Sequence, residues 1–160
     1  MTSDEKRGSR TRARVFAVAG IALLAGAAVT GLPAVAPQAP AVVVHKSPTC
    51  GCCTKWVEHL QGAGFTVQVH DMDDVEPIKN QQHVPVALRS CHTAIVGGYV
   101  FEGHVPADLI QKFLKEKPAF AGLAVPGMPM GSPGMEGPSK DAYNVVAFDQ
   151  SGTSAVYAKR

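Results

Sequence analysis

The 160-residue sequence predicts an α/β fold, because β-rich runs alternate with segments of helical hydrophobic periodicity. Two observations predict how these elements are connected. Gly97 and Gly98 separate two β-rich runs, which is a strong signal for a two-residue hairpin. Cys50 and Cys53 lie between a β-rich run and a helical one, at the spacing of a redox-active cysteine pair. Periodicity alone supports only the α/β assignment, and the topology depends on the cysteine spacing.

The first 41 residues have the pattern of a secretory signal peptide. Five basic side chains precede an uncharged run from residue 15 to residue 31, and small residues and prolines follow up to Ala41. The run is just shorter than a membrane span, so an uncleaved membrane anchor is the alternative. Residues 42–160 carry no basic excess, which argues against nucleic-acid binding. We expect a periplasmic or otherwise exported protein with no membrane span after cleavage.

The first half of the mature chain predicts two strands and two helices. Residues 41–45 are β-rich, and Thr49 is placed to cap a helix that runs to about Gln61. The apolar face of this helix is formed by Cys53, Trp56, Val57 and Leu60. Residues 65–69 alternate like a strand, and residues 71–80 form a short, weakly apolar helix or loop.

The next segment predicts the hairpin and a third helix. Its strands are residues 93–96 and 99–101, and Pro106 opens a helix that continues to about Glu116. The resulting order, β-α-β-α-β-β-α, is that of a thioredoxin-like domain, which would cover residues 42–124. This expectation combines the element order with the spacing of the cysteine pair.

Residues 125–160 predict an irregular loop followed by a terminal β-hairpin that packs on the same domain. The loop, residues 125–138, contains too many glycines and prolines for regular structure. Its methionines, Met128, Met130 and Met135, have little core to fill, so they suggest capture of a soft metal ion. A flexible linker with incidental methionines is the alternative.

Three of the four cysteines, Cys50, Cys52 and Cys53, fall within four residues at a predicted helix start, where the helix dipole favours thiolates. A structural disulfide between such near neighbours would stabilise little, because it closes a very short loop. A redox disulfide between Cys50 and Cys53 is better chemistry, but Cys52 would compete with it. Zinc usually needs a second ligand pair, whereas Cu(I) suits compact bridging thiolates. Metal binding is the leading interpretation, and thiol redox chemistry is the second.

Cys91 and two histidines extend the predicted site. In a thioredoxin-like topology the segment that begins the third strand lies across from the redox pair, so Cys91 should face the cysteine cluster; an isolated buried cysteine or a disulfide partner is the alternative. His92 is either a ligand or a turn residue. His104 is a candidate copper ligand with Glu102 as its supporting partner, or part of a solvated turn.

With these residues in view, the chain resembles the CopG-type periplasmic copper proteins, a thioredoxin-like family. The matching segments are KSPTCGCC at 46–53, SCHTA at 90–94, GYVFEGHVP at 98–106, VPGMP at 125–129 and GSPGME at 131–136. The resemblance implies a small copper cluster held by cysteines, and a role in copper handling that includes changing the oxidation state of copper. The cysteines that match the family's own are Cys50, Cys52, Cys53 and Cys91.

We therefore predict a copper-binding protein for copper tolerance that holds more than one Cu(I). The predicted ligands are Cys50, Cys52, Cys53, Cys91, His104, Met128 and Met135, with Cys50 and Cys53 as the redox-active pair of a copper oxidoreductase. The expected partners are copper ions and other periplasmic copper-handling proteins or a copper exporter. A thiol-disulfide oxidoreductase and a passive copper chaperone or buffer are the alternatives, and the sequence leaves open whether the chain is an enzyme.

Overall fold

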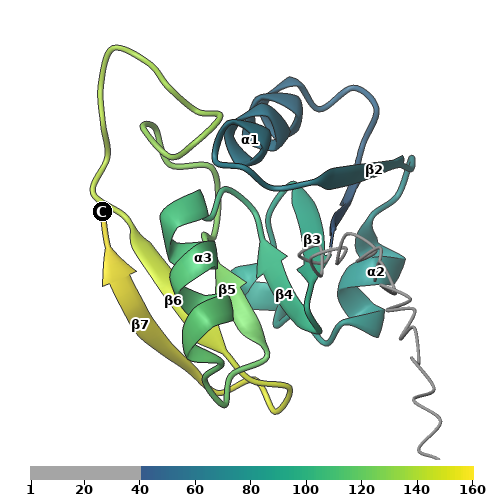
Figure 1. Cartoon of the computed structure of the whole chain (residues 1–160), viewed down its shortest axis with the longest axis vertical. Coiled ribbons are helices and arrows are strands. Elements are labelled where there is room, and N and C mark those ends of the chain that lie inside the picture. The colour runs from purple at the N-terminus through teal and green to yellow at the C-terminus, as the bar shows by residue number, and fades with distance from the viewer. Residues whose placement is uncertain (1–40) are drawn as a thin grey trace, which may run out of the picture. The chain divides into compact units, whose positions relative to one another are not determined.

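A mixed sheet of seven strands runs through residues 41–160, the part of the chain that this computed structural model describes (Figure 1). The predicted signal peptide lies outside this part, apart from Ala41. The elements are β1 (Val42–Lys46), α1 (Gly51–Gly62), β2 (Val67–Asp71), α2 (Glu76–Gln81), a 3-10 turn (Val86–Leu88), β3 (His92–Val96), β4 (Tyr99–Glu102), α3 (Ala107–Glu116), β5 (Gly122–Ala124), β6 (Asn144–Phe148) and β7 (Ser154–Lys159).

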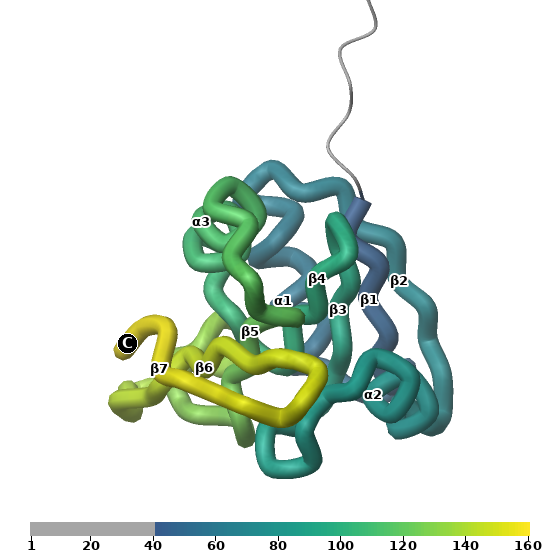
Figure 2. The backbone as a smooth tube through the Cα atoms, turned by 90° about the horizontal axis from the view of Figure 1, so that it is seen from below, coloured from purple at the N-terminus to yellow at the C-terminus, as the bar shows by residue number. Residues whose placement is uncertain are grey.

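The strand order is β2-β1-β3-β4-β5-β6-β7, so β2 and β7 form the two edges of the sheet (Figure 2). β1 is parallel to β2 and antiparallel to β3, and β3 is antiparallel to β4. β4 is parallel to β5, and β5, β6 and β7 pair antiparallel in turn. The mixed α/β prediction is therefore confirmed, and the elements from β1 to α3 follow in the predicted order.

The terminal hairpin, β6 and β7, joins the same sheet through β5, a strand that the sequence did not predict. The prediction that Thr49 caps α1 is wrong. Cys50 occupies the N-cap position without a side-chain cap, because a turn from the Ser47 carbonyl to the Cys50 amide keeps Thr49 outside the helix. The Thr49 hydroxyl instead lies 3.1 Å from the Ser47 hydroxyl.

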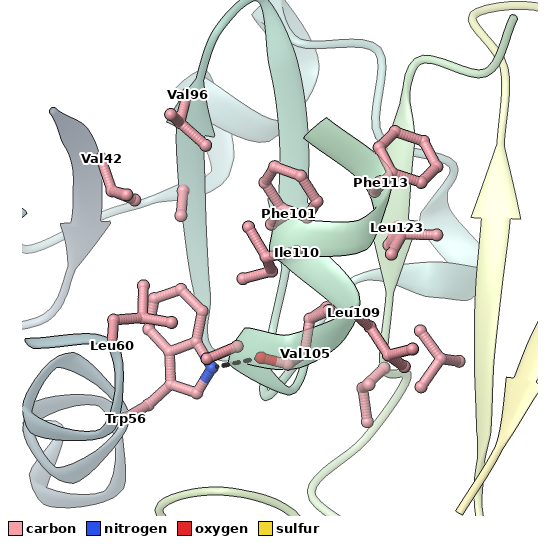
Figure 3. Packing of buried hydrophobic residues seen from close by; sticks show 14 of the residues in the cluster. Val42, Trp56, Leu60, Val96, Phe101, Val105, Leu109, Ile110, Phe113 and Leu123 are labelled. Carbon is pink, nitrogen blue, oxygen red and sulfur yellow. Dashed lines mark hydrogen bonds between the residues drawn. The ribbon is translucent and has the colours of Figure 1, made fainter. Parts of the chain in front are cut away.

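Helices α1 and α3 cover one face of the sheet, and their apolar sides form the main core (Figure 3). Trp56 is fully buried in this core and donates an indole N–H bond of 2.9 Å to the Val105 carbonyl, which links α1 to the segment before α3. The opposite face packs Val84 and Leu88 against Val100 and other side chains of β4 to β6. Successive side chains of β4 point to opposite faces of the sheet, so Phe101 packs in the main core and Val100 in the opposite layer. In the described part of the chain, no helix has the length and apolar character needed to cross a membrane.

Candidate metal centre

The structure brings all four cysteines together at one end of the sheet. The Sγ atoms of Cys50, Cys52, Cys53 and Cys91 all lie within 4.8 Å of one another. Cys50 and Cys53 form a disulfide, while Cys52 and Cys91 are free thiols. The Cys52 sulfur lies 3.6 Å from the Cys50 sulfur. The site therefore contains one oxidised pair and two reduced thiols.

The pairing of two strands explains why cysteines far apart in the sequence meet. β1 and β3 are antiparallel neighbours, and Lys46 at the end of β1 lies opposite His92 at the start of β3. Helix α1 begins shortly after β1, and Cys91 immediately precedes β3. The cysteine-rich start of α1 and the Cys91 thiol are consequently placed at the same sheet end.

His104 contacts the Cys91 thiol and has a defined tautomer. Its Nε2 lies 3.1 Å from the Cys91 sulfur, and its Nδ1 lies 2.7 Å from the Pro133 carbonyl oxygen. Because a carbonyl can only accept, Nδ1 carries the proton and Nε2 offers its lone pair to Cys91. Burial lowers the pKa of His104, which favours this neutral form.

His92 is a further candidate ligand that the sequence left undecided. Its Nδ1 lies 3.3 Å from the Cys91 sulfur, and its ring packs 4.3 Å from the ring of Trp56. Burial, and then the neighbouring His104, lower the pKa of His92 well below its ordinary value. Its Nε2 is buried and has no hydrogen-bond partner within residues 41–160. Cys91, His92 and His104 together offer one sulfur and two neutral nitrogens.

Burial and the adjacent Cys52 raise the pKa of Cys91 to about 11, although the Ser90 hydroxyl opposes this shift. Cys91 therefore keeps its proton near neutral pH, and its thiol can donate a hydrogen bond to His104 Nε2.

The loop between β5 and β6 runs beside the start of α1 (Figure 1). Two hydrogen bonds fasten it to the site: the Ser90 hydroxyl donates to the Gly127 carbonyl at 2.7 Å, and His104 Nδ1 donates to Pro133. The Met128 side chain next to Gly127 is 53% exposed, and Met135 is half-buried. The predicted methionines thus sit on a loop whose backbone contacts the cysteine site.

Comparison with known proteins identifies relatives of this chain. The family described as "Protein of unknown function, DUF411" matches residues 88–135, which contain Cys91, His104 and the loop methionines Met128, Met130 and Met135. Two solved structures, named "Copper resistance protein copG- Form 2" and "Form 1", share 45% sequence identity over 77% of this chain. Their TM-scores are 0.73 and 0.72, and the match covers 99% and 98% of those chains. This chain belongs to the CopG family. No curated protein matched it.

The CopG-family chain also contains a buried ion pair next to the site. Lys79 and Glu102 are 1% and 0% exposed, and Lys79 Nζ lies 2.6 Å from the Glu102 carboxylate. Glu102 also accepts the Ser90 backbone N–H at 2.6 Å and the Thr93 hydroxyl at 2.7 Å. Glu102 was predicted to support His104. Its hydrogen bonds go instead to Lys79, Ser90 and Thr93, because β4 directs it to the side of the sheet that carries α2.

Gly134→Ala is expected to detach the loop from the candidate metal centre of the CopG-family chain. A Cβ at this position would lie 2.6 Å from the Cys52 carbonyl oxygen and 3.0 Å from the Trp56 amide nitrogen, both backbone atoms. We expect an overpacking cost of about 1–3 kcal/mol in addition to the left-handed backbone strain. Urea unfolding followed by Trp56 fluorescence measures the change.

Gly127→Ala is the matched control for this substitution. Gly127 also has a positive φ, of 71°, but a Cβ at this position would meet no atom within 4 Å. Gly127→Ala should therefore lower the free energy of unfolding by the backbone strain alone, about 1–2 kcal/mol. Equal losses in the two variants would mean that the loop does not pack on α1 in solution.

Proposed function

We propose that this chain is an exported copper-binding protein that serves copper tolerance and holds Cu(I) between its four cysteines. One observation carries the proposal: the sulfur atoms of Cys50, Cys52, Cys53 and Cys91 lie within 4.8 Å of one another. Thiolates are the ligands that Cu(I) prefers, and sulfurs this close can bridge more than one ion. The solved relatives are named copper resistance proteins, which supports the same use of this site.

The remaining ligands would come from the surroundings of Cys91 and from the loop. His104 presents a lone pair 3.1 Å from the Cys91 sulfur, and Nδ1 of the neutral His92 lies 3.3 Å from the same sulfur. In the proposal Met128 helps to complete the site and Met135 helps to load it, since thioethers bind soft ions and both residues belong to the fastened loop.

The cysteine pair provides the redox chemistry of the proposal. When the Cys50 and Cys53 thiols form their disulfide, they release two electrons and two protons, which reduces two Cu(II) to two Cu(I). Cu(I) is then retained by the thiols that are not in the disulfide. The Cys91 proton leaves to solvent as the thiolate becomes a ligand, while His104 Nε2 keeps its lone pair for copper because the Pro133 carbonyl holds the ring proton on Nδ1.

The proposal treats the part from β1 to α3 as a thioredoxin-like unit. Its support is the parallel pairing of β1 with β2, the antiparallel pairing of β1 with β3, and a cysteine pair at the start of the first helix. A periplasmic location follows from the leader of residues 1–41, and the proposed partners are copper ions and the proteins that deliver or export them.

A disulfide at Cys50–Cys53 favours a second candidate, a thiol-disulfide oxidoreductase that acts on protein disulfides. Reduction of insulin without copper, together with no bound copper, would support this candidate. Copper binding without any change in its oxidation state would support a passive chaperone or buffer.

Cys52→Ser separates the copper function from plain disulfide exchange. We expect the reduced wild-type chain, loaded anaerobically with Cu(I), to retain more than one ion with its thiols masked. The variant should lose bridging capacity and retain fewer ions, because Cys52 lies next to the redox pair without belonging to it. Metal analysis and a thiol count on both proteins give the answer. An unchanged copper content in the variant would contradict a four-cysteine site.

A further inference from the structure

We propose that Cys52 and Cys91 form a second disulfide, so that the site stores four electrons in two cysteine pairs. This inference rests on the proposed copper function and extends it. With Cys50 paired to Cys53, the remaining two cysteines are both free thiols, and their sulfur atoms lie within 4.8 Å of each other. Cys52 comes from the first turn of α1 and Cys91 from the segment before β3.

The surroundings hold Cys91 in place against Cys52. His104 and His92 contact the Cys91 sulfur at 3.1 and 3.3 Å, and the Ser90 hydroxyl lies 3.9 Å away. The Gly134 backbone lies against the Cys52 carbonyl, so the loop packs on the first turn of α1. The two thiols are therefore confined to one small, partly buried volume.

Closing the bond needs only local movement. A disulfide requires its sulfurs to approach to about 2.0 Å. Cys52 lies in the first turn of α1, where the backbone N–H groups have no partners within the helix. A side-chain rotation with a small shift of this turn can therefore join the sulfurs without breaking the helical hydrogen bonds that follow.

The chemistry balances with Cu(II) as the oxidant. The Cys52 and Cys91 thiols lose two protons and two electrons as their S–S bond forms, and two Cu(II) become two Cu(I). The Cys50 and Cys53 pair supplies another two electrons when its own disulfide forms. The first disulfide leaves two thiols that can hold Cu(I), and the second removes them. We therefore assign the first pair to copper reduction and the second to a further reduction coupled to Cu(I) release.

The pairing can be tested without copper by oxidising the reduced full chain with diamide and digesting it with trypsin under non-reducing conditions. Residues 47–55 form one tryptic peptide with Cys50, Cys52 and Cys53, and residues 90–112 form another with Cys91. Only a disulfide to Cys91 joins the two peptides. We expect the joined pair in the wild type and its loss in Cys52→Ser. A wild-type chain without the joined pair, or a Cys52→Ser chain that keeps it, would overturn the proposal.

The second test counts the Cu(I) ions that each reduced chain produces from Cu(II). Reduced protein is mixed anaerobically with excess Cu(II) and a chelator that binds only Cu(I). We expect about four Cu(I) per wild-type chain, and about two for both Cys52→Ser and Cys91→Ser, which keep the first pair. About two Cu(I) from the wild type would overturn the inference even if copper binding is normal. If the chain retains no Cu(I) in the absence of chelator, the proposed function fails, while the diamide cross-link still tests the pairing.

Discussion

Gly122→Ala is expected to lower the free energy of unfolding by about 4 kcal/mol or more, which few single substitutions do. A Cβ at Gly122 would lie 1.8 Å from the Val100 carbonyl oxygen and 2.7 Å from its carbonyl carbon. Both are backbone atoms of β4, so no side-chain rotation can relieve the clash. β5 also pairs on its other side with β6, and it therefore cannot move away freely.

The same substitution should also weaken copper binding at the proposed metal centre. β5 is the link between β4 and the terminal hairpin, and the methionine loop begins directly after it. Separating β4 from β5 would move the point at which the loop leaves the sheet, and with it Gly127 and Pro133. We expect reduced copper retention in any folded fraction of the variant, measured by metal analysis after anaerobic loading.

Gly62→Ala is the control for Gly122→Ala. Gly62 ends α1, and a Cβ there would meet no atom within 4 Å. Because alanine loses less conformational entropy than glycine in a helix, this variant should be neutral or stabilised by up to about 1 kcal/mol. Urea unfolding followed by Trp56 fluorescence compares the two. A Gly122→Ala variant as stable as Gly62→Ala would contradict the pairing of β5 with β4.

The short strand β5 also shows where sequence reasoning stopped. Helix α1 could be predicted because Trp56 and Leu60 repeat at helical spacing, and the hairpin of β3 and β4 because two glycines mark its turn. β5 has three residues, Gly122–Ala124, which are too few to show a period. It is a strand because β4 and β6 supply its hydrogen-bond partners, and this depends on tertiary structure.

The site was predictable to the extent that its residues cluster in the sequence. Cys50, Cys52 and Cys53 at the start of α1 could be recognised from their spacing in the sequence. The position of Cys91 could be predicted only by assuming a topology. His92 could not be assigned, since its role depends on contacts with Trp56 and His104 that form only in the folded chain. The burial of Lys79 could not be predicted, because a lysine on a short polar helix normally faces water.

Lys79→Met alone is expected to lower the free energy of unfolding by about 3–5 kcal/mol, because it leaves the Glu102 carboxylate buried without its cation. Burial already raises the pKa of Glu102, and Lys79 opposes that shift. Without Lys79 the folded-state pKa rises further above the unfolded value. A carboxyl with a raised folded pKa favours the folded state at low pH and loses this contribution as pH rises. The loss should thus be larger at about pH 8 than at about pH 5, as urea unfolding would show. A pH-independent loss would contradict this account.

Two double variants then separate stability from positioning. Lys79→Met with Glu102→Gln, and Lys79→Met with Glu102→Leu, both remove the buried charges and should recover much of the lost stability. Only glutamine keeps an oxygen that can accept the Ser90 N–H. Ser90 precedes Cys91 and also holds the loop through Gly127, so its placement affects both Cys91 and the loop at the proposed metal centre. We expect the glutamine variant to retain copper and the leucine variant to retain less. Equal copper content in two equally folded variants would mean that Glu102 stabilises the fold without positioning Cys91.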